Sequence, residues 1–135
     1  MILMFSHYAN RHKGVCLQFE IDEDDAAILF GREVEYKDTI PPFKDGSQAH
    51  MTLLTKYKKW EYEGEYRVLM GVNPGGNRIR KYKLSQLRGT IFGMHMASSD
   101  EHLVRCWFKK GGHKTPFFKK AQLSEDGFAL RYIDV

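Results

Sequence analysis

The sequence predicts a single small domain, residues 1–135, of the α+β class, with a mostly antiparallel sheet and three or four short helices packed on it. The chain has 135 residues and a mass of 15.8 kDa, which suits one hydrophobic core rather than two. Its 42% hydrophobic and 28% charged residues are typical of a globular protein and exclude a disordered one. Hairpin signals stand beside helical segments instead of alternating regularly with them, which favours an antiparallel sheet.

Residues 6–37 contain signals for two helices and two strands. In chain order, these are helix 6–13, strand 15–21, helix 22–30 and strand 33–37. Ser6 is the expected cap of the first helix and Gly14 its end. Alternation predicts that the first strand buries Val15, Leu17, Phe19 and Ile21, and the second Val34 and Tyr36.

The middle of the chain contains a loop, a helix and three strands. In order, we expect loop 38–48, helix 49–59, strand 62–72, turn 73–77, strand 78–84 and strand 90–94. Proline and glycine pairs predict the loop, and helical spacing of Leu53, Leu54 and Tyr57 predicts the helix. An Asn-Pro-Gly-Gly-Asn sequence predicts the turn.

The last third of the chain carries the clearest signals. A helix should begin at Ser98 or Ser99 as its cap, and Gly111 and Gly112 should end it after Lys110. Two alternating segments, 116–123 and 128–133, then surround a short turn and predict a terminal hairpin.

The net charge of +4 conceals an uneven distribution of charge. Residues 66–124 hold 12 Lys and Arg but only Asp100 and Glu101 as acidic residues, a balance of +10, whereas the remainder has a balance of −6. Such an asymmetry is typical of a nucleic-acid surface or of two self-complementary halves, although folding can also average it out. The basic segment 78–83, followed by Arg88, is either part of a phosphate-binding surface or a charged edge strand.

Several classes of protein and site are disfavoured by the sequence. No apolar run approaches the roughly 20 residues of a membrane helix, and the apolar start of the chain is too short for a signal peptide. Cys16 and Cys106 stand in apolar surroundings, as expected for free thiols in a cytoplasmic protein. His7 and His12 have the wrong spacing for a shared zinc face, so we expect no metal and no cofactor.

A glutamate-rich segment, 60–67, is the densest set of candidate functional residues. As a strand it would place Trp60, Tyr62, Tyr66 and Val68 on a core side, and Glu61, Glu63, Glu65 and Arg67 on the other side. Neighbouring carboxylates on one strand face lie roughly 6.6 Å apart, and their crowding raises at least one pKa, as general acid–base chemistry requires. The alternative is a solvated strand face, neutralised by Arg67 and a nearby lysine.

The segment 6–14 is the second candidate. A helix would place Tyr8 and His12 on one face, with His7 and Arg11 beside them. His7 is either an acid, a base or an anion donor, or a buried hydrogen-bonded histidine.

These segments resemble a bacterial family known as domain of unknown function 2971. The resemblance is carried by Ser6-His7-Tyr8-Ala9, His12-Lys13-Gly14-Val15-Cys16 and Phe19, Val34-Glu35-Tyr36, Lys56, Trp60, Tyr62-Glu63, Glu65 and Tyr66-Arg67, Leu87, and Ile91-Phe92-Gly93. It spans nearly the whole chain. Because family members usually carry a further N-terminal region, we expect this chain to correspond to the C-terminal half of the family. The resemblance implies that His7, Tyr8, Glu63, Glu65 and Arg67 face one site.

These observations lead to three hypotheses of function. The first is a module that binds an anionic small molecule or a protein partner in a polar pocket; its expected binding residues are His7, Tyr8, His12, Lys56, Glu63, Glu65 and Arg67. The second is a nucleotide-processing enzyme, either a hydrolase or one similar to ADP-ribosyltransferases, with Glu63, Glu65 and His7 as candidate catalytic residues. The third, nucleic-acid binding by the basic second half, is not favoured. Apolar residues 1–5 predict a homodimer.

Overall fold

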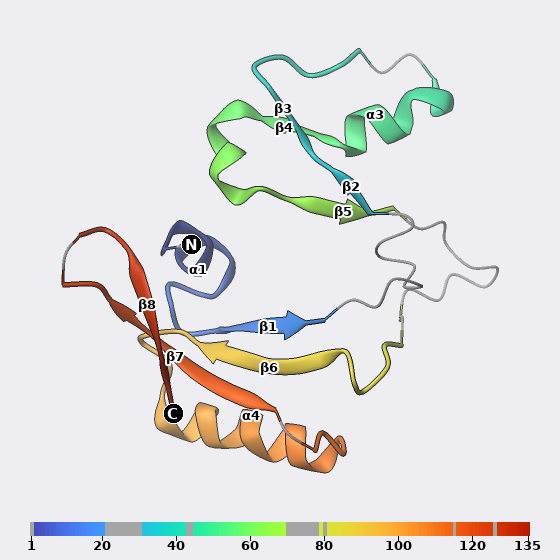
Figure 1. The fold of residues 1–135 in the computed structure, drawn as a ribbon. Helices are drawn as coiled ribbons and strands as arrows, with labels where there is room; N and C mark the ends of the chain where they lie inside the picture. Colours follow the sequence, from blue (N-terminus) through green and yellow to red (C-terminus); the bar gives the residue numbers. More distant parts are fainter. Residues whose placement is uncertain are drawn as a thin grey trace. The chain divides into compact units, whose positions relative to one another are not determined.

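A computed structural model describes residues 2–20, 31–42, 45–69, 79, 81–114, 116–125 and 127–135. The chain forms two compact units (Figure 1): unit 1 is Met1–Glu20 with Lys81–Val135, and unit 2 is Ile21–Arg80. The predicted helix 22–30, the turn 73–77, and Arg78 and Arg80 lie outside the described residues. The assignment of the whole chain to a single domain stays a prediction.

Unit 1 is built on one sheet with the strand order β1-β6-β7-β8. Its elements are α1 (Ile2–Tyr8), β1 (Val15–Phe19), β6 (Leu87–Phe92), α4 (Ser98–Lys110), β7 (Phe117–Leu123) and β8 (Leu130–Asp134). The pairs β1–β6 and β7–β8 are antiparallel, and β6–β7 is parallel. The predicted α+β class, the long helix and the terminal hairpin are therefore confirmed. The predicted cap is wrong, because Ala97 precedes the helix as its N-cap and Ser98 and Ser99 lie inside the helix.

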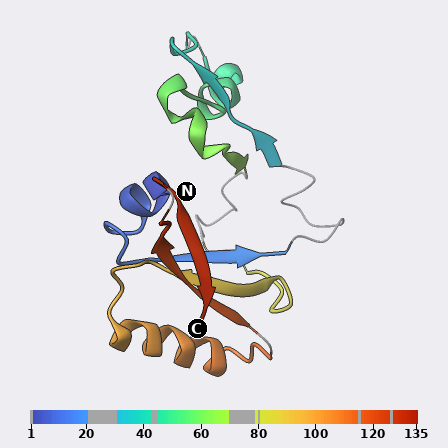
Figure 2. The same cartoon turned by 60° about the vertical axis from the view of Figure 1, so that its left-hand side comes forward.

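Helices α1 and α4 cover opposite faces of this sheet (Figures 1 and 2). Because side chains alternate along a strand, Ile91 and the next residue, Phe92, face different helices. Ile91 packs with Phe5 and Ala9 from the α1 side, whereas Phe92 packs with Val104 and Phe108 of α4. Each face of the sheet thus has its own hydrophobic core.

The predicted helix 6–13 is wrong in position. Helix α1 begins at Ile2 and ends at Tyr8. The N-terminal segment is helical because this conformation buries the apolar side chain of Phe5 against the sheet. Asn10, Arg11 and His12 then adopt left-handed φ angles of 46°, 53° and 65°. Ser6 is consequently inside the helix instead of capping it.

The predicted burial along β1 is also partly wrong. Leu17 and Phe19 are 47% and 46% exposed, whereas Val15 and Cys16 pack against the two cores. The register with β6 shifts between Gln18 and Phe19, which changes the alternation near the end of the strand. Residues 81–84 form no strand, which corrects the described part of the predicted strand 78–84; β6 itself begins at Leu87.

Unit 2 consists of short elements. These are β2 (Gly31–Glu33), β3 (Glu35–Lys37), η1 (Gly46–Gln48), α3 (Ala49–Leu53), β4 (Thr55–Tyr57), η2 (Lys58–Glu63) and β5 (Tyr66–Val68). β2 pairs antiparallel with β5, and β3 pairs parallel with β4. The predicted strand 33–37 is interrupted at Val34, which is only 2% exposed and donates its backbone N–H to the carbonyl of Glu65.

The predicted helix 49–59 and strand 62–72 are both corrected in unit 2. Helix α3 ends at Leu53, and the segment 58–63 forms a 3₁₀ helix. Gly64 follows with a left-handed φ of 52°, which resets the direction of the chain before β5. As a result Tyr62 and Tyr66 are 44% and 71% exposed, so the strand phase that made them core residues is wrong.

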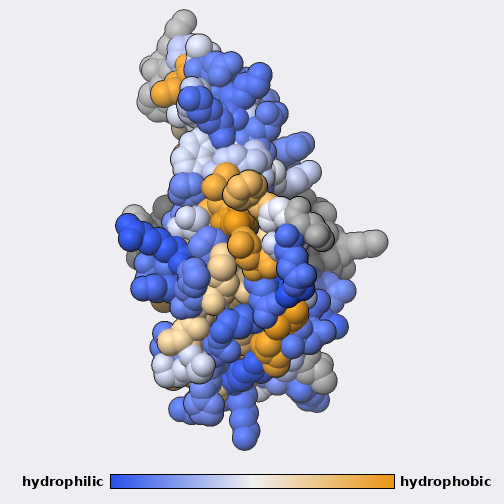
Figure 3. Space-filling model, turned by 90° about the vertical axis from the view of Figure 1, so that its left-hand side faces the viewer, coloured by the Kyte–Doolittle hydropathy of each residue, from blue (hydrophilic) through white to orange (hydrophobic). Residues whose placement is uncertain are grey.

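Exposed hydrophobic side chains occur on both units, and Figure 3 shows hydrophobic surface bordered by hydrophilic residues on one face. In the apolar N-terminal segment, Leu3 is 46% exposed but Phe5 is buried. Part of this apolar segment is therefore already buried within unit 1. The homodimer stays a prediction.

We predict that Gly93→Ala strongly destabilises the protein. A Cβ atom at Gly93 would overlap the backbone carbonyl group of His12, whose carbon would lie only 2.6 Å away. Backbone atoms must then move, so the free energy of unfolding should fall by about 3 kcal/mol. Urea unfolding followed by circular dichroism measures this change.

Gly46→Ala is the matched control, because a Cβ there meets no atom within 4 Å. Its free energy of unfolding should stay within about 1 kcal/mol of the wild type. A Gly93→Ala protein as stable as the control would contradict the close contact between the backbone at Gly93 and the backbone at His12.

Candidate functional site

Four of the predicted site residues come together in unit 2. Lys56 comes from β4, Glu63 ends η2, and Glu65 and Arg67 stand on either side of the first residue of β5. The left-handed Gly64 separates the two glutamates, so they approach Lys56 from different backbone directions. We call these four residues the ion cluster.

The geometry of the ion cluster is that of a connected network. The Lys56 ammonium donates hydrogen bonds to Oε2 of both Glu63 and Glu65, the latter at 3.0 Å. Arg67 donates to both oxygens of Glu65, from Nε at 2.6 Å and from Nη2 at 3.1 Å. Two cations thus face two carboxylates, and the bidentate contact fixes the orientation of Glu65.

The members of the ion cluster differ in burial. The Glu63 side chain is only 2% exposed and that of Lys56 is 17% exposed, whereas Glu65 and Arg67 are each 29% exposed. A carboxylate as buried as that of Glu63 needs a charged or hydrogen-bonding partner, which Lys56 provides. The inner pair is therefore structurally required, and the outer pair lies nearer to solvent.

Charge pairing determines the protonation of the outer pair. Hydrogen bonding from Arg67 is the main cause that lowers the pKa of Glu65, with a further contribution from Lys56. The same hydrogen bond raises the pKa of Arg67. Glu65 is consequently ionised near neutral pH, which suits a residue that orients cations and does not suit a general acid.

Two aromatic residues support the ion cluster. The backbone N–H of Glu65 donates a 2.8 Å hydrogen bond to the hydroxyl of Tyr36 on β3. The Lys56 ammonium lies 5.1 Å from the centroid of the Trp60 ring, within the range of a cation–π contact. Trp60 is half-buried, and its ring packs beside the Lys56 ammonium.

Lys56 also borders a cavity of about 460 Å³ within unit 2. The cavity is lined by Lys37, Asp38, Thr39, Ile40, Pro41, Thr52, Thr55, Lys56 and Tyr57. Thr55 donates its hydroxyl to the carbonyl of Met51 at 2.7 Å. In contrast, Oγ1 of Thr52 is buried and has no hydrogen-bond partner among the residues described. Sequence reasoning missed Thr52, because nothing in an apolar helical segment marks one hydroxyl as unpaired.

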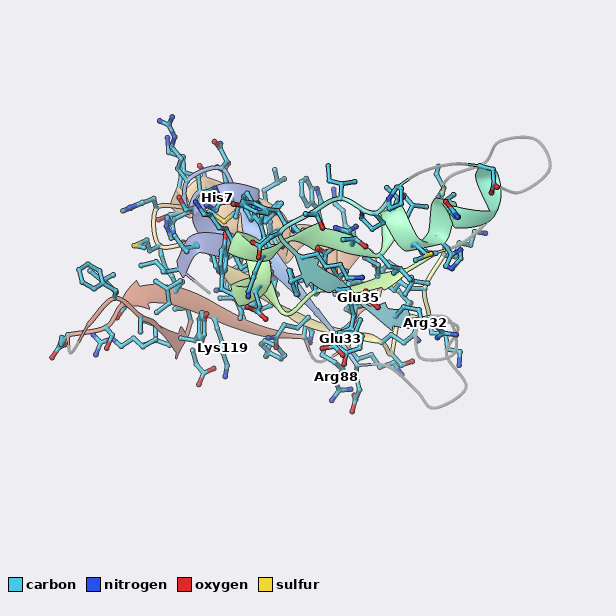
Figure 4. All side chains as sticks on the ribbon, turned by 90° about the horizontal axis from the view of Figure 1, so that it is seen from above. His7, Arg32, Glu33, Glu35, Arg88 and Lys119 are labelled. Atoms are coloured by element: carbon cyan, nitrogen blue, oxygen red, sulfur yellow. The ribbon has the colours of Figure 1, made fainter. Side chains whose placement is uncertain are left out.

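The other three predicted binding residues lie in unit 1. His7 is on α1, where Figure 4 labels it, and its ring contacts the ring of Tyr8 edge-on at 6.5 Å. His12 follows the helix in the left-handed segment, so the predicted shared face with Tyr8 is wrong. The common site for His7, Tyr8 and the ion cluster stays a prediction.

His12 packs inside unit 1. Its ring stacks on Phe5 at 6.1 Å and meets His95 edge-on at 6.0 Å. Burial lowers the pKa of His12, with a smaller contribution from His95, and its Nδ1 has no hydrogen-bond partner in the described part of the chain. These contacts indicate a structural role for His12.

Among the described residues, no group of three or more His, Cys, Asp or Glu side chains is arranged to hold a metal ion. Within the same residues, no helix is both long and apolar enough to cross a membrane.

Comparison with known families supports the resemblance seen in the sequence. Residues 4–68 match the model of a family described as protein of unknown function (DUF2971), which supports the predicted resemblance to that family. The match lies in the N-terminal part of the chain and excludes Leu87 and Ile91–Gly93, so the expected resemblance over nearly the whole chain is too broad. All seven predicted binding residues fall within it. No curated protein and no solved structure matches the chain.

We predict that acid weakens unit 2 through Glu65. The pKa of Glu65 is lower in the folded chain than its ordinary value of 4.5, so below that value the unfolded state binds more protons. The stabilisation by ionised Glu65 is fully present above pH 4.5, and it is lost as the pH falls through the folded-state pKa of Glu65. Trp60 fluorescence in a Trp107→Phe background should show that the urea concentration at the unfolding midpoint decreases as the pH is lowered below 4.5.

Arg67→Met should flatten this acid dependence, because it removes the main cause of the lowered pKa. Arg131→Met is the matched control, since Arg131 pairs with Glu125 at the surface of unit 1, where both side chains are more than half exposed. An unchanged acid dependence in Arg67→Met would contradict the assignment.

Proposed function

We propose that unit 2 is a binding module that takes a small anionic molecule in the cavity beside Lys56. The observation that carries the proposal is that Lys56 belongs to both features: it is central to the ion cluster, and it also lines the cavity. Its ammonium is held between two carboxylates at the cavity wall, so little conformational freedom is lost when a ligand binds. A pre-positioned cation of this kind is typical of an anion site.

The lining of the cavity supports an anionic ligand with an apolar part. Lys37 and Lys56 bring two cationic groups to the lining, beside the carboxylate of Asp38. Lys37 pairs with Glu35 at 2.5 Å, but this pair lies at the surface, so a ligand anion can replace Glu35. The unpaired hydroxyl of Thr52 offers a hydrogen bond that a ligand oxygen would satisfy. Ile40 and Tyr57 add apolar surface, and a volume of about 460 Å³ suits a small molecule.

The remaining members of the ion cluster position Lys56. Glu63 and Glu65 orient its ammonium, and Arg67 holds Glu65 in place. Arg67, expected from the sequence to be a binding residue, therefore acts through Glu65 and has a positioning role in this proposal. Whether His7 contributes to the same ligand stays a prediction.

The enzyme hypothesis gains no specific support from the described residues. Glu63 and Glu65 both accept hydrogen bonds from Lys56, an arrangement that neutralises the Glu-x-Glu pair instead of presenting it to a substrate. Nucleic-acid binding, the homodimer and a cytoplasmic location likewise stay predictions.

We predict that Lys56→Met weakens anion binding by unit 2. Pyrophosphate and citrate serve as probes, with binding measured by amide chemical shifts in ¹H–¹⁵N NMR spectra of the full chain. The wild type should show saturable shifts at cavity residues, and Lys56→Met should weaken binding at least about tenfold, as expected for loss of a charged hydrogen bond. Lys58→Met is the control, because Lys58 is an exposed neighbour outside the cavity lining.

Thr52→Val keeps the proposal testable if Lys56→Met disturbs the fold. This variant removes only the unpaired hydroxyl, so unit 2 should stay folded and probe binding should weaken about threefold to tenfold. Binding that is equal in the wild type, Lys56→Met and Thr52→Val would overturn the proposed site.

A further inference from the structure

A second cavity, of about 370 Å³, lies within unit 1. It forms where the turn that precedes β6 approaches the segment that follows α4. Its lining consists of Leu84, Ser85, Leu87, Arg88, Gly112, His113, Lys114 and Pro116. None of these residues belongs to the ion cluster, and all lie outside the family match at residues 4–68.

The backbone after α4 brings the basic residues to this cavity. Gly111 ends the helix, and Gly112 takes a left-handed φ of 80°, which an L-residue rarely adopts. The chain then turns back, and the backbone N–H of His113 donates to the carbonyl of Phe108. This turn sets His113 and Lys114 at the cavity wall.

His113 has an unusual environment for a residue at a cavity wall. Its ring lies between two aromatic rings, 6.4 Å from Tyr82 and 5.0 Å from Phe108. Its Nδ1 is buried and has no hydrogen-bond partner among the described groups. An unsatisfied buried nitrogen is unfavourable, and a bound group at this cavity would satisfy it.

The charged part of the lining is entirely basic among the residues described. Arg88 and Lys114 are exposed, and no acidic side chain lines the cavity. Arg88, labelled in Figure 4, pairs with Glu20 at 3.2 Å, but both side chains are more than half exposed. Such a solvated pair is weak, so the guanidinium can exchange Glu20 for a ligand anion. Unit 1 as a whole favours anions, since it holds 12 Lys and Arg against 6 Asp and Glu.

We propose that this cavity binds a small molecule with an anionic group, phosphate or carboxylate, on an apolar body. The anionic group contacts Arg88 and Lys114, while Leu84, Leu87 and Pro116 contact the apolar body. The site is independent of the one proposed beside Lys56.

The experiment uses the full chain and four probes: phenyl phosphate, benzoate, inorganic phosphate and benzylamine. Binding is followed by ¹H–¹⁵N NMR at the cavity residues. Phenyl phosphate or benzoate should bind with a Kd of about 1 mM or tighter, and inorganic phosphate more weakly, because it lacks the apolar body. Comparison of the first two probes identifies the preferred anionic group.

The double variant Arg88→Met, Lys114→Met should weaken binding of the preferred probe at least about tenfold, since both charge-assisted contacts are lost. Both residues are exposed, so this variant should remain folded. Lys110→Met is the matched control: Lys110 is an exposed cation in the last turn of α4 and does not line the cavity.

His113→Phe tests the unpaired nitrogen, because it keeps an aromatic ring between Tyr82 and Phe108 and removes Nδ1; binding should weaken about threefold or more. Lys58→Met removes an exposed cation of unit 2 that lines neither cavity, so it should bind the probe as the wild type does. Absent binding, equal binding by the double variant, or tighter binding of benzylamine than of the anions would overturn the proposal.

Discussion

The pairing of Glu63 with Lys56 is the interaction on which unit 2 depends. The Glu63 side chain is only 2% exposed, and an unpaired carboxylate at that depth is strongly unfavourable. Strand β4 must therefore keep Lys56 against the end of η2. Glu65 shares the same ammonium, and Arg67 neutralises the second carboxylate, so the pairing extends from the interior to the surface. This ionic network connects β4 with the end of η2 and with β5.

The same constraint creates the candidate binding site. Lys56 is fixed between two carboxylates and also lines the adjoining cavity, where we propose that it serves as a pre-positioned cation. Unit 1 is stabilised in a different way, by two apolar clusters on opposite faces of its sheet. Arg88 and Lys114 remain exposed at a second cavity. The two proposed anion sites thus differ in their surroundings.

Sequence signals predicted the elements whose patterns are local. Helix α4 has acidic residues in its first turn and ends at two glycines. The sequences of β7 and β8 alternate between apolar and polar residues on either side of a short turn. The prediction was right for Tyr66–Val68, which form β5, and wrong for the segment 58–63, which forms a 3₁₀ helix. Alternation in residues 60–67 indicates a strand, and it does not reveal the left-handed φ at which Gly64 interrupts that strand. The chemistry of Lys56, Glu63, Glu65 and Arg67 was nevertheless visible as a dense set of opposite charges. The sequence did not indicate Thr52 or His113. Each has a buried polar atom without a hydrogen-bond partner among the described residues, a feature that arises only from tertiary packing.

A double-mutant cycle between Lys56 and Glu63 tests the central claim most directly. Unfolding of Lys56→Met, Glu63→Gln and the double variant is followed by Trp60 fluorescence in a Trp107→Phe background, so that the signal reports unit 2. Lys56→Met should lose about 3 kcal/mol of unfolding free energy, because it removes the cation paired with the buried Glu63 carboxylate. Glu63→Gln should lose less, because Lys56 keeps Glu65 as a partner. The double variant should then be more stable than the sum of the single losses predicts, by a coupling energy of about 2 kcal/mol. Additive losses, within about 0.5 kcal/mol, would show that the two residues do not depend on each other and would contradict this account.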